Sequence, residues 1–233
     1  MLAQLTKLRG AALNLLFPQF CVGCGKEGNF LCDSCLQSLP RIEPPICPRC
    51  GRPQATGRLC PSCYDWQADI DGIRSPFRFD GVIRTAVHQL KYRNLRAITP
   101  ALAILMNEYL EANHLDVDVI VPIPLHHKRI RERGYNQSAL LAKELGILVQ
   151  LPVDEESLVR DKYVLPQART NSVEERRLNV AGVFSCHGNK LQGKKVLLVD
   201  DVATSGATMN ACASVLKSAG AMNVWGLALA REI

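Results

Sequence analysis

Four Cys-x-x-Cys pairs lie within 43 residues near the start of this 233-residue chain. Each pair places two thiols on one turn, at a spacing that lets both thiolates reach one tetrahedral zinc ion, and two pairs complete a four-thiolate site. The pairs contain eight of the ten cysteines, namely Cys21 and Cys24, Cys32 and Cys35, Cys47 and Cys50, and Cys60 and Cys63. Eight thiolates predict two zinc ions. Four protein ligands on each ion leave no open coordination position, so both ions are expected to be structural.

The spacing of the cysteine pairs leaves their grouping open. We expect a sequential arrangement, with the first and second pairs on one ion and the third and fourth pairs on the other. A crossed arrangement, in which the first pair joins the third, satisfies the same spacing. A disulfide set or free thiols are further alternatives, and the redox compartment discriminates between these and metal binding.

The amino-terminal sequence indicates in which redox compartment the protein is found. Lys7 and Arg9 precede a short apolar run over residues 11–17, which Asn14 interrupts, and no small-residue cleavage site follows. This pattern is unlike a signal peptide, and no stretch of the chain approaches the roughly 18 uninterrupted apolar residues of a membrane span. We therefore expect a cytoplasmic protein with no membrane span. In that compartment paired cysteines indicate metal rather than disulfides.

The sequence divides into three predicted parts: an amino-terminal helix over residues 1–20, a double zinc-ribbon-like module over residues 21–70, and an α/β domain over residues 71–233. The module has no sustained helix or strand period, so it cannot bury much core of its own. The whole chain is 47% apolar and 21% charged, which is typical of one well-buried core with a small annex.

From residue 71 onward strand and helix signals alternate, which is typical of a largely parallel sheet with helices on both faces. The expected strands are residues 73–79, 117–122, 196–199 and 223–230. The expected helices are residues 82–91, 97–111, 136–145, ended by Gly146, and 207–219, ended by Gly220.

The most informative string of the sequence is residues 196–208. Asp200 and Asp201 follow a fully apolar strand, at the strand end where ligands bind in open α/β sheets. A short loop with hydroxyls and a glycine then leads into a helix, whose first amide N–H groups favour an anion. Carboxylates would repel a phosphate, so the aspartates are expected to accept hydrogen bonds from sugar hydroxyls. The string lacks the lysine of a Walker loop and the three glycines of the dinucleotide fingerprint.

A basic loop over residues 126–137 follows the strand that Pro122 and Pro124 end. In a parallel sheet this loop lies at the same strand end as the two aspartates. Arg129 and Arg133 are four residues apart and would face one way if this piece is helical, presenting two guanidinium groups to a pyrophosphate or to a nucleic-acid backbone. A solvated basic surface is the alternative. The net charge of +6 suits a phosphorylated metabolite or a nucleic acid equally.

Residues 196–208 resemble the phosphoribosyl pyrophosphate motif of type I phosphoribosyltransferases. The Pro-x-Pro-Leu and Arg-Gly-Tyr-Asn-Gln strings around the basic loop resemble those of the ComF family (ComFC- and GntX-like proteins), which joins a cysteine-knuckle module to that transferase fold. The resemblance spans residues 21–229. It implies that Asp200 and Asp201 bind the ribose 2- and 3-hydroxyls and that Mg²⁺ enters with the pyrophosphate. It further implies a 5-phosphate loop formed by Ala203, Thr204, Ser205, Gly206, Ala207 and Thr208.

A long polar segment between Arg160 and Phe184 exceeds the length of an ordinary connection. The resemblance implies that it closes over the substrate, as the flexible hood of type I phosphoribosyltransferases does. Within it Arg176 resembles a residue that recurs in the family, and it is a further candidate for binding pyrophosphate or nucleic acid.

Two classes of function suit these residues. The first is a phosphoribosyltransferase that moves ribose 5-phosphate from phosphoribosyl pyrophosphate to a nucleophile, although the sequence identifies neither the acceptor nor a catalytic residue. The second is a single-stranded DNA-binding accessory or a regulatory ligand sensor without turnover, with Tyr64, Trp66 and Tyr135 as stacking residues. ComF relatives are associated with natural transformation, so the resemblance implies a role in competence and DNA uptake, with proteins of the competence machinery as partners. We favour phosphoribosyl binding and lean towards turnover.

Overall fold

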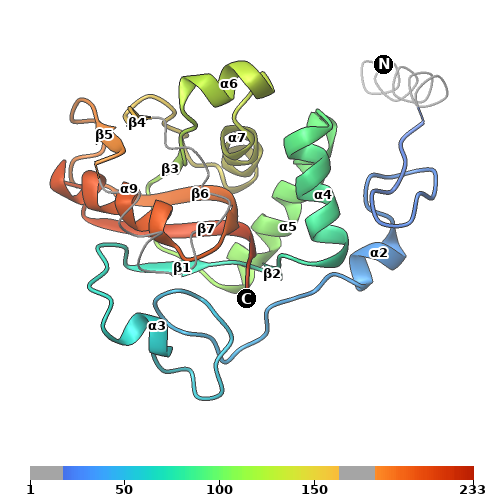
Figure 1. The fold of residues 1–233 in the computed structure, drawn as a ribbon, viewed down its shortest axis with the longest axis horizontal. Coiled ribbons are helices and arrows are strands. Elements are labelled where there is room, and N and C mark those ends of the chain that lie inside the picture. The colour runs from blue at the N-terminus through green and yellow to red at the C-terminus, as the bar shows by residue number, and fades with distance from the viewer. Residues whose placement is uncertain (1–17, 163–181) are drawn as a thin grey trace.

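A five-stranded parallel sheet forms the centre of the computed structural model, which describes residues 18–162 and 182–233 (Figure 1). The strand order is β1–β7–β6–β3, and β2 also pairs with β7. The strands are β1 (Gly72–Arg74), β2 (Phe77–Arg78), β3 (Val119–Pro122), β6 (Lys195–Ala203) and β7 (Asn223–Arg231). The predicted α/β class and parallel sheet are confirmed.

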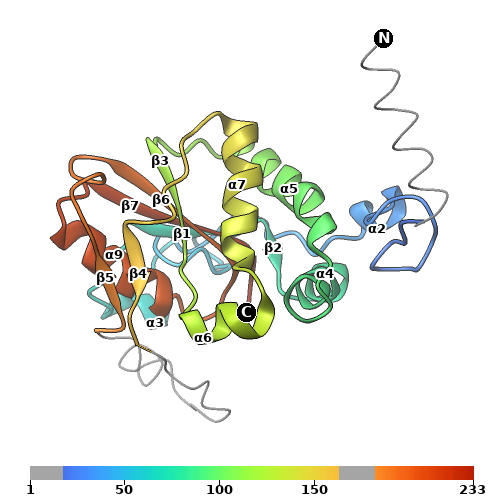
Figure 2. The same ribbon diagram turned by 90° about the horizontal axis from the view of Figure 1, so that it is seen from above.

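Helices cover both faces of the sheet (Figures 1 and 2). One face packs against α4 (Gly81–Tyr92), α5 (Thr99–Ala112) and α7 (Gln137–Val149), and the other against α9 (Ala207–Ser218). The shorter helices are α2 (Asp33–Gln37), α3 (Pro61–Tyr64), the 3₁₀ turn η1 (Arg96–Ile98) and α6 (His127–Arg133). Among the helices of the described residues, none is both long enough and apolar enough to cross a bilayer.

The apolar run in β6 reflects this double covering. Val196 and Leu198 pack into the core that includes α9, whereas Leu197 and Val199 pack into the core that includes α4, α5 and α7. Successive side chains of a strand point to opposite faces, so a strand buried on both faces reads as a continuous apolar run. All four side chains are fully buried.

The two cysteine-rich segments lie at different places on the sheet. The segment with the last four cysteines and α3 packs under β1, on the face that α9 also covers, and Trp66 and Ile70 belong to the same core. The segment with the first four cysteines and α2 lies beside α4, where Gly23 approaches Val82 (Figure 1). The second segment is therefore part of the core on the α9 side of the sheet, whereas the first contributes Leu31 and Leu39 to the core on the α4, α5 and α7 side.

A small antiparallel sheet joins the two ends of the predicted hood. It pairs β4 (Leu158–Arg160) with β5 (Phe184–Cys186). Residues 163–181, with the candidate Arg176, lie outside the described residues, as does most of the amino-terminal helix expected over residues 1–20. Both remain predictions.

Two of the expected elements have different limits. The strand expected over residues 73–79 is split into β1 and β2 at Pro76, which has no N–H to donate to a neighbouring strand. The helix expected to end at Gly146 continues and is capped at Gln150, whose φ is 57°. Gly146 instead permits close packing, because a Cβ there would lie 2.6 Å from Val153 Cγ2.

Two differences concern the predicted site itself. β6 does not end at residue 199 but continues through both aspartates to Ala203, because β7 pairs with it as far as Arg231. The basic segment expected as a loop contains a helix, α6, which begins after His126 and ends at Gly134 with a φ of 83°. His126 Nδ1 accepts a hydrogen bond from the Lys128 amide and so caps this helix.

Candidate functional site

Asp200 and Asp201 lie side by side near the end of β6, and a different helix holds each of them. The Asp201 side chain is 3% exposed, and its Oδ2 lies 2.7 Å from Lys91 Nζ in α4. Asp200 Oδ1 accepts hydrogen bonds from Ser138 Oγ in α7 (2.7 Å) and from the Asp201 amide (2.9 Å). The packing of α4 and α7 on one face of the sheet thus fixes the acidic pair.

The two aspartates differ in their electrostatics. Burial, and next the negative charge of Asp201, raise the pKa of the Asp200 carboxyl to about 7. Burial lowers the pKa of Lys91, but the Asp201 carboxylate more than offsets this, so that the pKa is raised. The site therefore combines a lysine-paired carboxylate with a carboxyl group that titrates near neutral pH.

The turn from β6 into α9 forms the loop predicted to hold a phosphate. Gly206 adopts a left-handed φ of 79° directly before the helix, and Ser205 Oγ accepts a hydrogen bond from the Ala207 amide (3.3 Å). The first turn of a helix has amide N–H groups without intrahelical acceptors, and its dipole favours negative charge. The predicted residues all lie in this turn or at its two ends: Ala203, Thr204, Ser205, Gly206, Ala207 and Thr208.

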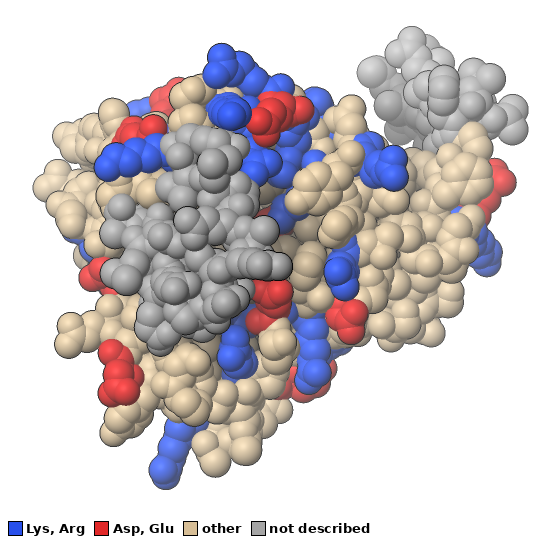
Figure 3. Space-filling model, viewed as in Figure 1, with Lys and Arg blue, Asp and Glu red and all other residues tan. Residues whose placement is uncertain are grey.

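A cavity of about 460 Å³ lies between α4 and α6, and neither aspartate of the acidic pair lines it. Lys91 connects the cavity with the acidic pair, because it lines the cavity and also pairs with Asp201. Figure 3 shows Lys and Arg side chains gathered in the upper part of the molecule, where Figure 1 places α6. The lining residues are Lys91, Tyr92, Asn94, Arg129, Glu132, Arg133 and Tyr135. The cavity is thus cationic and partly aromatic.

The two predicted arginines of α6 line this same cavity. Arg133 Cζ lies 5.6 Å from the centroid of the Tyr92 ring, and Arg133 also donates a hydrogen bond to Gln137. Arg129 Nη1 lies 3.6 Å from the Glu132 carboxylate in an exposed pair. Arg129 and Arg133 are one helical turn apart, so both guanidinium groups lie on the same side of α6, as their spacing in the sequence indicates.

Sequence reasoning missed Lys91 and Ser138. Lys91 carries no local signal, because its partner is more than a hundred residues away along the chain. Ser138 does carry a local signal, because it directly follows the Arg-Gly-Tyr-Asn-Gln string and lies two residues after Asn136. Asn136 caps α7 by accepting a hydrogen bond from the Ser138 amide (3.1 Å), which places Ser138 in the first turn, facing β6.

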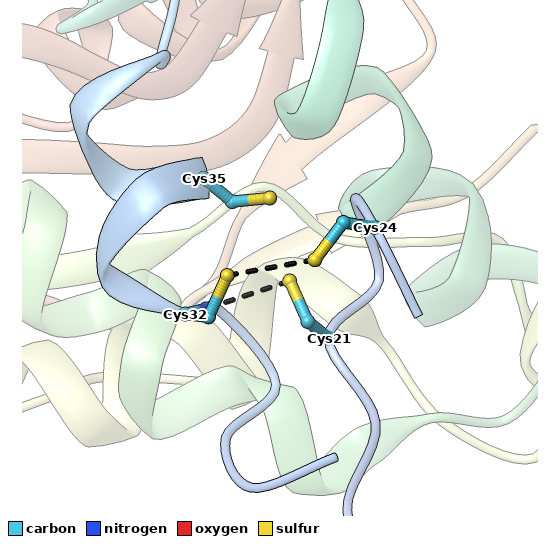
Figure 4. A group of neighbouring side chains, drawn as sticks. All are labelled: Cys21, Cys24, Cys32 and Cys35. Carbon is cyan, nitrogen blue, oxygen red and sulfur yellow. Dashed lines mark hydrogen bonds between the residues drawn. The ribbon is translucent and has the colours of Figure 1, made fainter. Parts of the chain in front are cut away.

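The eight paired cysteines form two clusters in the sequential arrangement, and the four Sγ atoms of each cluster lie within 4.8 Å of one another. In the first cluster, Cys24 Sγ and Cys32 Sγ are 3.6 Å apart. Zinc–sulfur bonds of about 2.3 Å in a tetrahedron put neighbouring sulfurs about 3.8 Å apart, so this donor set fits zinc. Figure 4 shows its four sulfurs turned towards a common centre: Cys21, Cys24, Cys32 and Cys35.

The second cluster is more deeply buried. Cys50 Sγ and Cys60 Sγ are 3.7 Å apart, which again fits zinc. A hydrogen bond from Cys63, and then the positive charge of Arg231, lower the pKa of the Cys50 thiol to about 4, which favours the thiolate that zinc requires. With four sulfur ligands, an ion here would stabilise the fold and offer no open position to a substrate. The members are Cys47, Cys50, Cys60 and Cys63.

Another cavity, of about 470 Å³, lies at the start of β3 and is lined by Asp118, Asp154, Glu155 and Lys190 among others. In a parallel sheet this is the end opposite to the one where Asp200 and Asp201 lie. None of the residues predicted from the sequence lines it, so it adds nothing to the candidate site.

Two family profiles match this sequence: the double zinc ribbon domain over residues 12–64 and the phosphoribosyl transferase domain over residues 94–230. The acidic pair and the loop before α9 both lie within the second match. The chain is thus a double zinc ribbon joined to a phosphoribosyltransferase-type domain.

Relatives share both parts. Competence protein ComFC of Bacillus subtilis (strain 168) is 30% identical over 202 residues, which are 84% of this chain and 81% of that protein. Competence protein F of Haemophilus influenzae is 29% identical over 212 residues, 87% of this chain and 91% of that protein. The chain therefore belongs to the ComF family.

Among solved structures, the fold is similar to glutamine phosphoribosylpyrophosphate amidotransferase from B. subtilis, complexed with ADP and GMP. The similarity has a TM-score of 0.39 and 21% identity and covers 56% of this chain. It spans only 26% of that enzyme's length.

Proposed function

We propose that the chain binds phosphoribosyl pyrophosphate, or a related ribose phosphate, at the carboxyl ends of the central strands. The observation that carries this proposal is the acidic pair beside the loop of residues 203–208, at the start of a helix. Carboxylates suit sugar hydroxyls, and a helix amino terminus suits a phosphate. One sugar phosphate uses both, since its hydroxyls and its 5-phosphate lie on opposite sides of the ribose ring.

In this proposal Asp200 and Asp201 accept hydrogen bonds from the 2- and 3-hydroxyls, and the loop amides donate to the 5-phosphate. Arg129 and Arg133 face the pyrophosphate, which brings its own Mg²⁺. Lys91 Nζ pairs with Asp201 Oδ2 at 2.7 Å and so holds this side chain in place for the ribose. Arg176 remains a further candidate from sequence alone.

Turnover is the finer part of the proposal. The C1–oxygen bond to pyrophosphate breaks, an acceptor forms a new bond to C1, and pyrophosphate leaves with the bonding electrons. The fixed carboxylates and amides hold the ribose while positive charge develops on it. The names of the relatives support a role in competence. Our proposal adds DNA uptake as the process, the cytoplasm as the location and competence proteins as partners.

The test is calorimetry with phosphoribosyl pyrophosphate and Mg²⁺. Wild type is expected to bind, and Asp200→Ala/Asp201→Ala to bind at least about 100-fold more weakly, because two hydrogen bonds to charged groups are lost. Glu155→Ala/Glu156→Ala removes the same charge from an exposed site and serves as the matched control. Equal affinity of wild type and the aspartate variant would refute the assignment.

Single-stranded DNA binding is a second candidate, favoured by the cationic and aromatic lining of the cavity at α6. Cationic grooves with aromatic residues bind single strands through phosphates and stacked bases, with a steep salt dependence. Arg129→Ala/Arg133→Ala is expected to weaken binding of a fluorescent oligonucleotide about tenfold at low salt. An oligonucleotide that wild type fails to bind even at low salt would exclude this candidate.

A further inference from the structure

The two cysteine clusters have different surroundings. In the first, Cys24 is exposed and Cys32 is partly exposed. In the second, all four cysteines are at most 3% exposed and belong to one core with residues of β6, β7 and α9. A metal site in the central core is placed to affect the neighbouring loop of residues 203–208.

The segment of the second cluster is in direct contact with the sheet. Gly51 follows the third cysteine pair with a φ of 72°, and a Cβ there would lie 2.5 Å from the carbonyl oxygen of Ile73 in β1. The Ile73 amide donates to the Arg49 carbonyl (2.7 Å). Any shift of this turn would therefore move β1 or break a hydrogen bond to it.

The same segment also contacts the phosphate loop. A Cβ on Gly206 would lie 2.6 Å from Ile73 Cδ1 and 3.4 Å from the Trp66 ring. One turn further on, Asn210 Oδ1 accepts hydrogen bonds from the amides of Asp69 (2.8 Å) and Ile70 (3.2 Å). The left-handed turn that begins α9 thus rests on residues that directly follow the fourth cysteine pair.

Arg231 connects the loop with the cluster. It ends β7, is 1% exposed, and its Nη2 donates to the Thr204 carbonyl (3.3 Å). Among the described residues, its Nε and Nη1 have no hydrogen-bond partner. Its charge acts on the thiols of Cys50 and Cys63. Buried guanidinium groups require partners, and groups around a metal site commonly donate to its ligands. The thiolates of a zinc-loaded cluster would supply negative charge close to this buried guanidinium group.

We propose that Arg231 is a positioning residue that couples zinc at the second cluster to the phosphate loop, so that the second zinc site, and not the first, supports binding of a ribose phosphate. With zinc bound, four thiolates leave a net negative charge that holds the guanidinium, and the guanidinium holds Thr204. Without zinc, the buried arginine loses this anchor and the loop loses its fixed conformation. This coupling extends the proposed function and rests on it for the identity of the ligand.

The test compares Arg231→Met with Arg78→Met in the full chain. Arg78 is the sheet neighbour of Arg231 and is exposed, so it is a matched control. Arg231→Met is expected to differ from wild type roughly tenfold in three measurements. It should release one zinc to a chelator faster and exchange the amide hydrogens of residues 203–208 faster. It should also bind the Mg²⁺ complex of phosphoribosyl pyrophosphate more weakly. Arg78→Met is expected to stay within about twofold in all three measurements.

Two further variants keep the result interpretable. Arg231→Lys retains the positive charge but lacks the several N–H donors of the guanidinium group. It is therefore expected to retain zinc and still show faster amide hydrogen exchange in residues 203–208. If Arg231→Met fails to fold, Arg231→Lys tests the coupling instead. Cys24→Ser/Cys32→Ser is expected to lose one zinc without a change in loop exchange or affinity. Wild-type loop exchange in both Arg231 variants, or an equally large loss in the first-cluster variant, overturns the coupling. If wild type binds no phosphoribosyl pyrophosphate, the proposed function fails while loop exchange and zinc release still test Arg231.

Discussion

Replacing Lys91 with methionine is expected to lower the free energy of unfolding by about 3–5 kcal/mol at pH 7.5. Asp201 is almost fully buried, and Lys91 Nζ, at 2.7 Å, is its ion-pair partner. Removing one partner of a buried ion pair leaves an uncompensated charge, which costs far more than the pair contributes. Urea denaturation followed by circular dichroism measures the change.

Two comparisons give this prediction its specificity. Lys143→Met removes a lysine from an exposed pair with Glu155, so it is expected to change stability by less than about 1 kcal/mol. Lys91→Met/Asp201→Asn removes both charges and is expected to recover most of the loss. A double variant as unstable as Lys91→Met would show that packing, rather than the unpaired carboxylate, causes the effect.

Asp200→Asn is expected to have opposite effects on stability and on binding. The Asp200 pKa is about 7 in the folded chain, against about 3.9 when exposed to water. A carboxyl group with a raised folded pKa takes up protons preferentially in the folded state, so it costs stability as the pH rises from about 4 to 7. Asparagine avoids this cost. At pH 8 we expect a gain of about 1–2 kcal/mol, together with a roughly tenfold or greater loss of affinity for the ribose phosphate.

The pH dependence of the stability gain tests whether titration of Asp200 causes it. The gain in stability is expected to be smaller at pH 5.5 than at pH 8, because Asp200 is then largely protonated in wild type. More acidic conditions would also remove zinc, since its ligands must be deprotonated. Denaturation curves at both pH values measure the difference, with Asp65→Asn as an exposed control. An equal gain at both pH values would exclude titration of Asp200 as its source.

Sequence reasoning succeeded where the signal is local. Each Cys-x-x-Cys pair specifies half a metal site within four residues, and the apolar run of residues 196–199 specifies a strand covered on both faces. The sequential grouping of the cysteines is confirmed by the two clusters. Residues 203–208 likewise form the end of a strand, a turn and the start of a helix, as their glycine and hydroxyls indicate.

What the sequence did not reveal depends on distant partners. β6 extends past both aspartates because β7 pairs along it, which no local pattern reports. The Lys91–Asp201 pair joins α4 to β6, and Gly146 is a close contact with Val153 rather than the end of a helix. The contact between Arg231 and the loop likewise joins segments that pattern analysis treats separately.

The central position of β6 and β7 has a consequence for folding during translation. These strands lie within residues 195–231, so the ribosome completes them, with α9 between them, after the other described elements of the chain. The cysteine segments emerge first and can acquire metal early, yet the surface that the second of them covers does not exist until the last strands are made. Pairings so distant in sequence form slowly, and the nascent chain therefore exposes apolar helix faces that chaperones would have to shield.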